Sequence, residues 1–411
     1  MTTGSENASY LRHLCLILGS SCNLACDYCY QNARNERSIS WTCVAAAINA
    51  ILRSKERKLE ISFTGGEPLL QFDTLRRAVE YIQSCAPEDR KIEFSISTNG
   101  LLITDDILEF LAANRFETQL SFDGVPGAQN HRDPGTFRFL DTLLDRIKNE
   151  YNEFFSQQFS VAYTLIPAGI PYLADSIEYF TGKDIRHIKL APVLTDRPEW
   201  SDSMAEQLDR EMKKVFAVSL EHYENAGRVP LNIFRGKFGD DICNSADGAL
   251  CGAPSAQSIA VDTDGEVYGC SVFARSYQEF TTPFLACCSS SLSIGHINSP
   301  GFTARLAGMT DSAKELRIFH HLDRKYSSYG KCSDCPYLAQ CTICPASIAH
   351  IPGNSDPGRI PDFPCAFNRA AMKYRALFPA GRNPGKLLEG PPGVEDEIRW
   401  WRELAGSRNA E

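Results

Sequence analysis

The sequence predicts an α/β fold in which parallel strands form an open, partial barrel. Six strand-like runs follow one another in the first half of the chain, and each leads into a run with apolar residues at helical spacing. Alternating strands and helices imply parallel strands joined by right-handed crossovers. Because six units are too few for a closed eight-stranded TIM barrel, we expect a partial (β/α)6 barrel. Its site should lie at the carboxyl ends of the strands.

The individual elements follow from local pattern. Strands are predicted at 14–18, 59–63, 92–96, 119–122, 159–165 and 187–190. The helices that follow them are predicted at about 41–51, 73–82, 107–111, 137–147, 173–180 and 203–225. Ser40 is expected to cap the first helix, because a serine hydroxyl can accept from a free backbone N–H in the first turn.

Composition is that of a globular protein with an unusual number of cysteines. The 411 residues suit two domains, or one large domain with an extension, and 43% are apolar. A net charge of −9 argues against a nucleic-acid partner, because phosphate binding requires a basic face. The sequence has no apolar run long enough for a membrane span. Sixteen cysteines without an export signal indicate metal binding or catalysis, and we expect a cytoplasmic protein.

A cysteine loop follows the first predicted strand. Cys22, Cys26 and Cys29 are spaced C-x3-C-x2-C, with the aromatic Tyr28 directly before the third cysteine. Three thiolates on one short loop can hold three irons of a 4Fe–4S cluster and leave the fourth iron open to a chelating ligand. A zinc loop is the alternative, but zinc would require a fourth nearby Cys or His at similar spacing.

This loop resembles the signature of the radical S-adenosylmethionine (SAM) superfamily. The resemblance implies that Cys22, Cys26 and Cys29 bind a 4Fe–4S cluster and that Tyr28 packs near the adenine of SAM. It also implies that one electron, from a donor such as flavodoxin or ferredoxin, cleaves SAM. The products would be methionine and a 5′-deoxyadenosyl radical, which takes a hydrogen atom from the substrate.

Two further motifs follow the second and third predicted strands. The run Gly65-Gly66-Glu67 resembles the family's motif for the SAM amino group, since glycines let backbone carbonyls approach an ammonium and Glu67 can accept from it. By the same resemblance Ser97 and Asn99 would bond the ribose. A turn that leads into a helix, and an Asn-Gly turn, are the alternatives.

The fourth strand is followed by Ser121 and Asp123, which we expect to face the ribose or the substrate. The SAM carboxylate should be held by an arginine, because a guanidinium can bond a carboxylate with two parallel hydrogen bonds. Arg132 is the candidate that we assign, and Arg138 is the other.

Cysteines return in the second half of the chain. Residues 258–262 and 266–269 predict a hairpin about Asp264-Gly265, between Cys251 and Cys270. These two cysteines resemble, together with Cys332, Cys335, Cys341, Cys344 and Cys365, the SPASM extension, which carries two auxiliary 4Fe–4S clusters. The resemblance implies an outer cluster on Cys332, Cys335, Cys341 and Cys365, and an inner cluster on Cys251, Cys270 and Cys344. A pair of zinc knuckles is the alternative, since C-x2-C pairs suit zinc.

The fourth ligand of the inner cluster is open at this stage. Cys243, which is separated from Cys251 by seven residues, is the ligand that we favour. The alternative is an open iron that binds a substrate thiolate or another donor. The remaining cysteines are Cys15, Cys43, Cys85, Cys287 and Cys288, and most of them are expected to be buried packing residues.

The two cysteine signatures together predict a SPASM-type radical SAM enzyme. We expect a radical SAM barrel over 1–230, a small α+β SPASM domain over 231–370, and a linker with a C-terminal helical tail over 371–411. The expected cofactors are SAM and three 4Fe–4S clusters, and the expected reaction is maturation of a ribosomally made peptide or a protein. The alternatives are a radical SAM enzyme that acts on a small molecule and an iron–sulfur electron carrier without turnover.

One residue separates this chain from sulfatase maturases. In that subfamily an aspartate that serves as the catalytic base follows the second SPASM cysteine, whereas here Cys270 is followed by Ser271. A serine hydroxyl is too weak a base at neutral pH. We therefore predict that this protein does not make formylglycine in sulfatases.

Overall fold

The structure is a computed structural model. It describes residues 10–31, 36–193, 199–235, 257–277, 293–306, 326–338, 341, 343, 356 and 358–379. The predicted ligands Cys243, Cys251 and Cys344, and the predicted C-terminal helix near 394–405, lie outside these residues.

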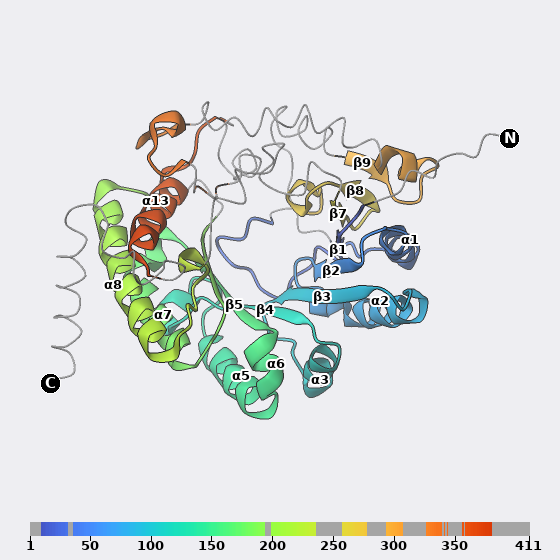
Figure 1. The fold of residues 1–411 in the computed structure, drawn as a ribbon, viewed down its shortest axis with the longest axis horizontal. Helices are drawn as coiled ribbons and strands as arrows, with labels where there is room; N and C mark the ends of the chain where they lie inside the picture. Colours follow the sequence, from blue (N-terminus) through green and yellow to red (C-terminus); the bar gives the residue numbers. More distant parts are fainter. Residues whose placement is uncertain are drawn as a thin grey trace.

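A sheet with strand order β6-β5-β4-β3-β2-β1-β7-β8-β9 forms the centre of the molecule (Figure 1). The first six strands pair in parallel, as predicted. They are β1 His13–Ile17, β2 Lys58–Thr64, β3 Lys91–Thr98, β4 Glu117–Ser121, β5 Phe159–Leu165 and β6 Ile188–Pro192. The prediction of a mixed α/β fold with a parallel core is therefore confirmed.

Helices lie on the outside of the curved sheet (Figure 1). They are α1 Trp41–Leu52, α2 Phe72–Cys85, α3 Asp105–Ala113, α4 Pro126–Gln129, α5 Phe137–Glu150, α6 Asn152–Gln157, α7 Leu173–Gly182 and α8 Asp202–Ala226. Ser40 caps α1 as predicted, since its side chain accepts from the backbone N–H of Cys43. No helix in the described part of the chain is long and apolar enough to cross a membrane.

The predicted hairpin is confirmed, and it extends the barrel sheet. Strand β7 (Ser258–Val261) pairs antiparallel with β8 (Glu266–Tyr268), and β8 pairs antiparallel with β9 (Ser293–His296). Strand β7 also pairs in parallel with β1, the first strand of the chain. The sheet therefore runs across the predicted boundary near residue 230, and the division into three domains stays a prediction.

The last described helix, α13 (Asp362–Leu377), packs against α8 and the short helix η3 (Asn232–Phe234), at the β6 end of the sheet (Figure 1). Phe378, directly after α13, stacks on Phe234 with ring centroids 4.9 Å apart and also contacts Phe216 of α8. This aromatic cluster fixes α13 across the carboxyl ends of β5 and β6, where the site lies.

Candidate active site

A cavity of about 530 Å³ lies at the carboxyl ends of the six parallel strands. One wall consists of the cysteine loop and the loops after β2, β3 and β4, and the other includes α13. The predicted cluster and SAM residues that line it are Cys22, Cys26, Tyr28, Cys29, Gly65, Gly66, Glu67, Ser97, Asn99, Ser121 and Arg132. Of the residues named as SAM contacts from the sequence, Asp123 and the second arginine candidate, Arg138, are not part of this lining.

Two glycines hold the loop after β2 against the cysteine loop. The backbone N–H of Gly66 donates to the carbonyl of Gly19 (2.9 Å), and that of Glu67 donates to the carbonyl of Ser21 (2.9 Å). A Cβ atom on Gly65 would lie 2.4 Å from the Gly19 oxygen, and one on Gly66 would lie 2.2 Å from the Ser21 oxygen. Close backbone approach therefore requires glycine at both positions.

The carboxylate of Glu67 ties the ends of β2 and β3 together. It is 3% exposed and accepts from the Thr98 hydroxyl (2.7 Å) and from the backbone N–H groups of Asn99 (2.8 Å) and Leu69 (3.1 Å). Burial raises the pKa of Glu67, and these three donors oppose that rise. Because two carboxylate oxygens offer about four acceptor sites, one remains for a ligand's ammonium.

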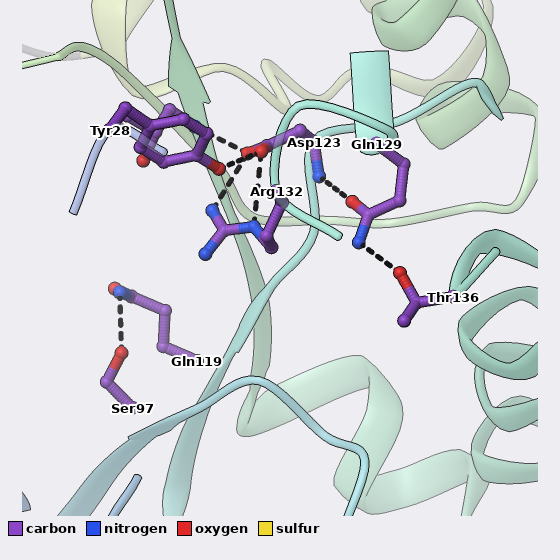
Figure 2. Close-up of polar contacts among 8 residues, drawn as sticks. Tyr28, Ser97, Gln119, Asp123, Gln129, Arg132 and Thr136 are labelled. Atoms are coloured by element: carbon purple, nitrogen blue, oxygen red, sulfur yellow. Dashed lines mark hydrogen bonds and ion pairs between the residues drawn. The ribbon is translucent and has the colours of Figure 1, made fainter. Parts of the chain in front are cut away.

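The amide of Asn99 joins the loop after β3 to the cysteine loop. Its Nδ2 donates to Asn23 Oδ1 (2.8 Å), and its Oδ1 accepts from the backbone N–H of Leu101 (3.0 Å). Ser97 accepts from Gln119 Nε2 at 3.3 Å, as Figure 2 shows. Asn23 could not be recognised as a partner of Asn99 from the sequence alone, because the contact spans 76 residues.

Behind the cavity wall, Asp123 binds two of its lining residues (Figure 2). Arg132 donates to it through Nη2 (2.9 Å to Oδ1) and Nε (3.1 Å to Oδ2), and the phenol of Tyr28 donates to Oδ2. The Arg132 guanidinium also lies 5.4 Å from the centroid of the Tyr28 ring. Burial raises the pKa of Tyr28 well above its ordinary value, so the phenol is a neutral donor.

The three thiols of the cysteine loop are half-buried and line one side of the cavity. Burial raises the pKa of Cys26 to about 11, and the nearby Arg132 acts in the opposite direction. No three His, Cys, Asp or Glu side chains within the described ranges lie close enough together to hold a single metal ion.

Four cysteines predicted for the outer cluster are brought near one another. Cys332 and Cys335 share a turn in which the Cys335 N–H donates to the Cys332 carbonyl (3.0 Å). Burial raises the pKa of the Cys341 and Cys365 thiols, and Cys335 lies close enough to both of them to add to this rise. Of the inner set the structure describes Cys270, which follows β8.

Of the three described cysteines predicted to be packing residues, two are buried as expected, whereas Cys85 at the end of α2 is exposed, contrary to that prediction. Cys15 of β1 is 8% exposed and Cys43 of α1 is 5% exposed. Cys15 lies near Cys270 and Ser271, and burial raises the pKa of the Cys15 thiol to about 12.

The wall formed by α13 was not identified from the sequence. It presents one stripe of the helix to the cavity, namely Pro364, Phe367, Asn368, Ala371, Met372 and Arg375. The spacing of three and four residues is that of one helical face and could have suggested it. The Asn368 amide donates to the Pro364 carbonyl (2.9 Å), which leaves this wall mainly apolar.

The fold and cavity define an α/β barrel enzyme with a thiol-lined site at the ends of its strands. Residues 16–149 match the sequence model of the Radical SAM superfamily. The cysteine-type anaerobic sulfatase-maturating enzyme of Clostridium perfringens (strain 13 / Type A) is 23% identical over 269 residues, which is 62% of this chain and 72% of that enzyme.

Two solved structures share the fold. Native anSMEcpe with bound AdoMet and Kp18Cys peptide superposes with a TM-score of 0.67 at 19% identity, over 88% of this chain and 96% of that one. Streptococcus suis SuiB bound to precursor peptide SuiA gives a TM-score of 0.53 at 14% identity, over 87% and 76% of the two chains. Residues 16–149 therefore resemble the Radical SAM superfamily, and the likeness of the chain to the sulfatase-maturating enzyme supports a radical SAM enzyme with an auxiliary-cluster domain.

Proposed function

We propose that this enzyme modifies a residue of a peptide or protein by radical hydrogen abstraction in the cavity described above. The observation that carries the proposal is the cavity itself. It joins the three thiols of the cysteine loop and the predicted SAM residues on one wall to an apolar wall on α13. Relatives with peptides in their structures, anSMEcpe and SuiB, support a peptide substrate.

The residues of the polar wall divide between cluster and SAM. Cys22, Cys26 and Cys29 would hold three irons, and the fourth would receive the amino acid end of SAM. When bound, the cluster supplies the electron that cleaves SAM and yields the 5′-deoxyadenosyl radical. Arg132 donates to Asp123 through Nε and Nη2, and its Nη1 makes no hydrogen bond within the described residues. Nη1 is therefore the donor for the SAM carboxylate.

The other predicted contacts follow from their places in the lining. Gly65, Gly66 and Glu67 would face the amino group of SAM, while Ser97, Asn99 and Ser121 would bond the ribose. The ring of Tyr28 would pack near the adenine. The apolar stripe of α13 excludes water from the space where the radical forms, which limits side reactions.

The auxiliary sites complete the proposal. Cys332, Cys335, Cys341 and Cys365 would hold an outer 4Fe–4S cluster, and Cys251, Cys270 and Cys344, with Cys243 as fourth ligand, an inner one. With the SAM cluster this makes about twelve irons per chain. A flavodoxin or ferredoxin is the proposed electron donor. Sulfatase maturation is not proposed, because Ser271 follows Cys270.

The test starts from anaerobically purified protein with SAM and dithionite. We expect 5′-deoxyadenosine, and we expect its rate to rise when a library of synthetic peptides is added, with a mass change in at least one of them. Formation of 5′-deoxyadenosine without modification of any such peptide, together with turnover of a small molecule, would overturn the peptide assignment.

A further inference from the structure

The buried carboxylate of Asp123, just after β4, binds residues of the cavity wall. Asp123 is 2% exposed and lies outside the cavity lining, whereas its partners Tyr28 and Arg132 lie in that lining. Four donors reach its two oxygens, namely Arg132 Nε and Nη2, the Tyr28 hydroxyl and the backbone N–H of Thr164 at 2.9 Å. A carboxylate with about four acceptor sites is thereby saturated.

A second row of contacts fixes Asp123 from behind. The backbone N–H of Asp123 donates to Gln129 Oε1 (2.9 Å), and Gln129 Nε2 donates to Thr136 Oγ1 (2.9 Å), as Figure 2 shows. Gln129 is fully buried. The next residue, Gly124, has φ +100° and is pressed against Ser176 of α7, so the loop after β4 has little freedom.

We propose that Asp123 is a positioning residue for SAM binding and does not itself touch SAM. It orients Arg132 so that Nη1 faces the cavity, and it holds Tyr28, between Cys26 and Cys29, against the end of β4. One carboxylate thus aligns the residue that would bind the SAM carboxylate with the loop that would bind the cluster. The inference rests on the proposed SAM site.

The two hydrogen bonds from Arg132 to Asp123 hold the guanidinium in one orientation. A guanidinium held by two parallel hydrogen bonds to a carboxylate cannot rotate without breaking both. Removal of the buried carboxylate would deprive Arg132, whose side chain is 10% exposed, of the ion pair that compensates its charge. The arginine would then change rotamer, and the cavity would lose its oriented donor.

The test is a double-mutant cycle on SAM affinity. We expect Asp123→Asn to weaken SAM binding by roughly tenfold or more, and Arg132→Lys to do the same. The double variant should bind SAM no more weakly than Arg132→Lys alone, because Asp123 acts through Arg132. Effects that simply multiply would overturn the proposal and favour direct contact between Asp123 and SAM.

Two measurements distinguish a positioning role of Asp123 from a general loss of protein structure. The iron content of Asp123→Asn should stay near that of the wild type, while the change in the electron paramagnetic resonance spectrum of the reduced protein on adding SAM should be diminished. Asp141→Asn is the matched control. Asp141 also accepts from a tyrosine and a cation, Tyr179 (2.7 Å) and Lys183 (2.6 Å), but lies outside the cavity lining, so SAM affinity should not change.

The proposal can still be tested if the Asp123→Asn variant does not fold. If Asp123→Asn is insoluble, Gln129→Met loosens the same carboxylate from behind and should weaken SAM binding by a smaller factor. Unchanged SAM affinity in Gln129→Met and Tyr28→Phe would then refute the proposal. Wild-type protein that neither binds nor cleaves SAM would instead refute the proposed function.

Discussion

At the scale of single residues, the position of the cysteine loop depends on the absence of side chains at Gly65 and Gly66. We expect Gly66→Ala to destabilise the protein by about 1–3 kcal/mol, because the new Cβ would lie 2.2 Å from a backbone oxygen and the loop would have to move. Thermal unfolding measures this change. The iron content after reconstitution should fall with it.

Gly182→Ala is the control for that substitution. Gly182 ends α7, and a Cβ there would meet nothing within 4 Å. Alanine is the better helix former by about 1 kcal/mol, so the variant should be as stable as the wild type or slightly more stable. Equal melting temperatures for Gly66→Ala and Gly182→Ala would contradict the close approach seen at Gly66.

The three cysteines of the loop give the second prediction at this scale. Joint substitution of Cys22, Cys26 and Cys29 by alanine should remove about four irons per chain and abolish 5′-deoxyadenosine formation. The remaining iron should stay on the C-terminal cysteines, since these lie on other elements. Iron analysis and chromatography of the reaction products measure both effects, and SAM cleavage by the triple variant would show that the cluster is bound elsewhere.

At the scale of elements, the ring of His13 joins strand β1 to both of its neighbours. Its nitrogens lie 3.0 Å from Ser258 Oγ on β7 and 2.8 Å from Ser62 Oγ on β2. Burial lowers the pKa of His13 from its ordinary 6.5, against a smaller opposite effect of Glu60. The folded state therefore binds fewer protons than the unfolded state just below that pH.

Because the pKa of His13 is lowered in the folded state, the stability of the protein should depend on pH in a defined direction. The contribution of His13 to the free energy of unfolding is present above pH 6.5 and is lost as the pH falls through the lowered folded-state pKa. We expect the difference in melting temperature between wild type and His13→Ala to be larger at about pH 7.5 than at about pH 5. A difference that grows on acidification would show that the ring is protonated in the fold.

The attachment of α13 gives a further prediction about an element. Phe378→Ala should destabilise the protein by about 3–5 kcal/mol, because it removes a buried ring that stacks on Phe234. Hydrogen exchange should rise over 362–377. Lys373→Ala is the control, since the Lys373–Asp209 ion pair is nearly half exposed on both sides and surface pairs contribute at most about 1 kcal/mol. Equal exchange in the two variants would mean that Phe378 does not anchor the helix.

At the scale of the whole molecule, local periodicity predicted the six parallel strands and the helices between them. Strands such as Phe159–Leu165 alternate buried and half-buried residues, and this pattern is visible in the sequence. The pairing of β7 with β1 was not predicted, because no local pattern specifies a partner 245 residues away.

In the candidate site, too, features of local sequence were predicted and long-range contacts were not. Motifs at the strand ends predicted the cavity residues, since the carboxyl ends of parallel strands converge on one site. The sequence did not reveal that Asp123 lies outside the cavity lining or that Glu67 is bonded to Thr98 and Asn99. Such roles depend on which long-range donors reach a carboxylate, and that follows only from the packing.

The place of β1 in the sheet has a consequence for synthesis. Its edge toward β7 cannot be covered until residues 258–261 have left the ribosome. A nascent chain that has folded only the first six units therefore carries an open strand edge in the middle of its future sheet. We expect a fragment that ends at residue 230 to associate through this edge, as measured by size-exclusion chromatography, and a monomeric fragment would argue against it. Chaperone protection of the nascent chain should accordingly matter most between the emergence of β6 and that of β7.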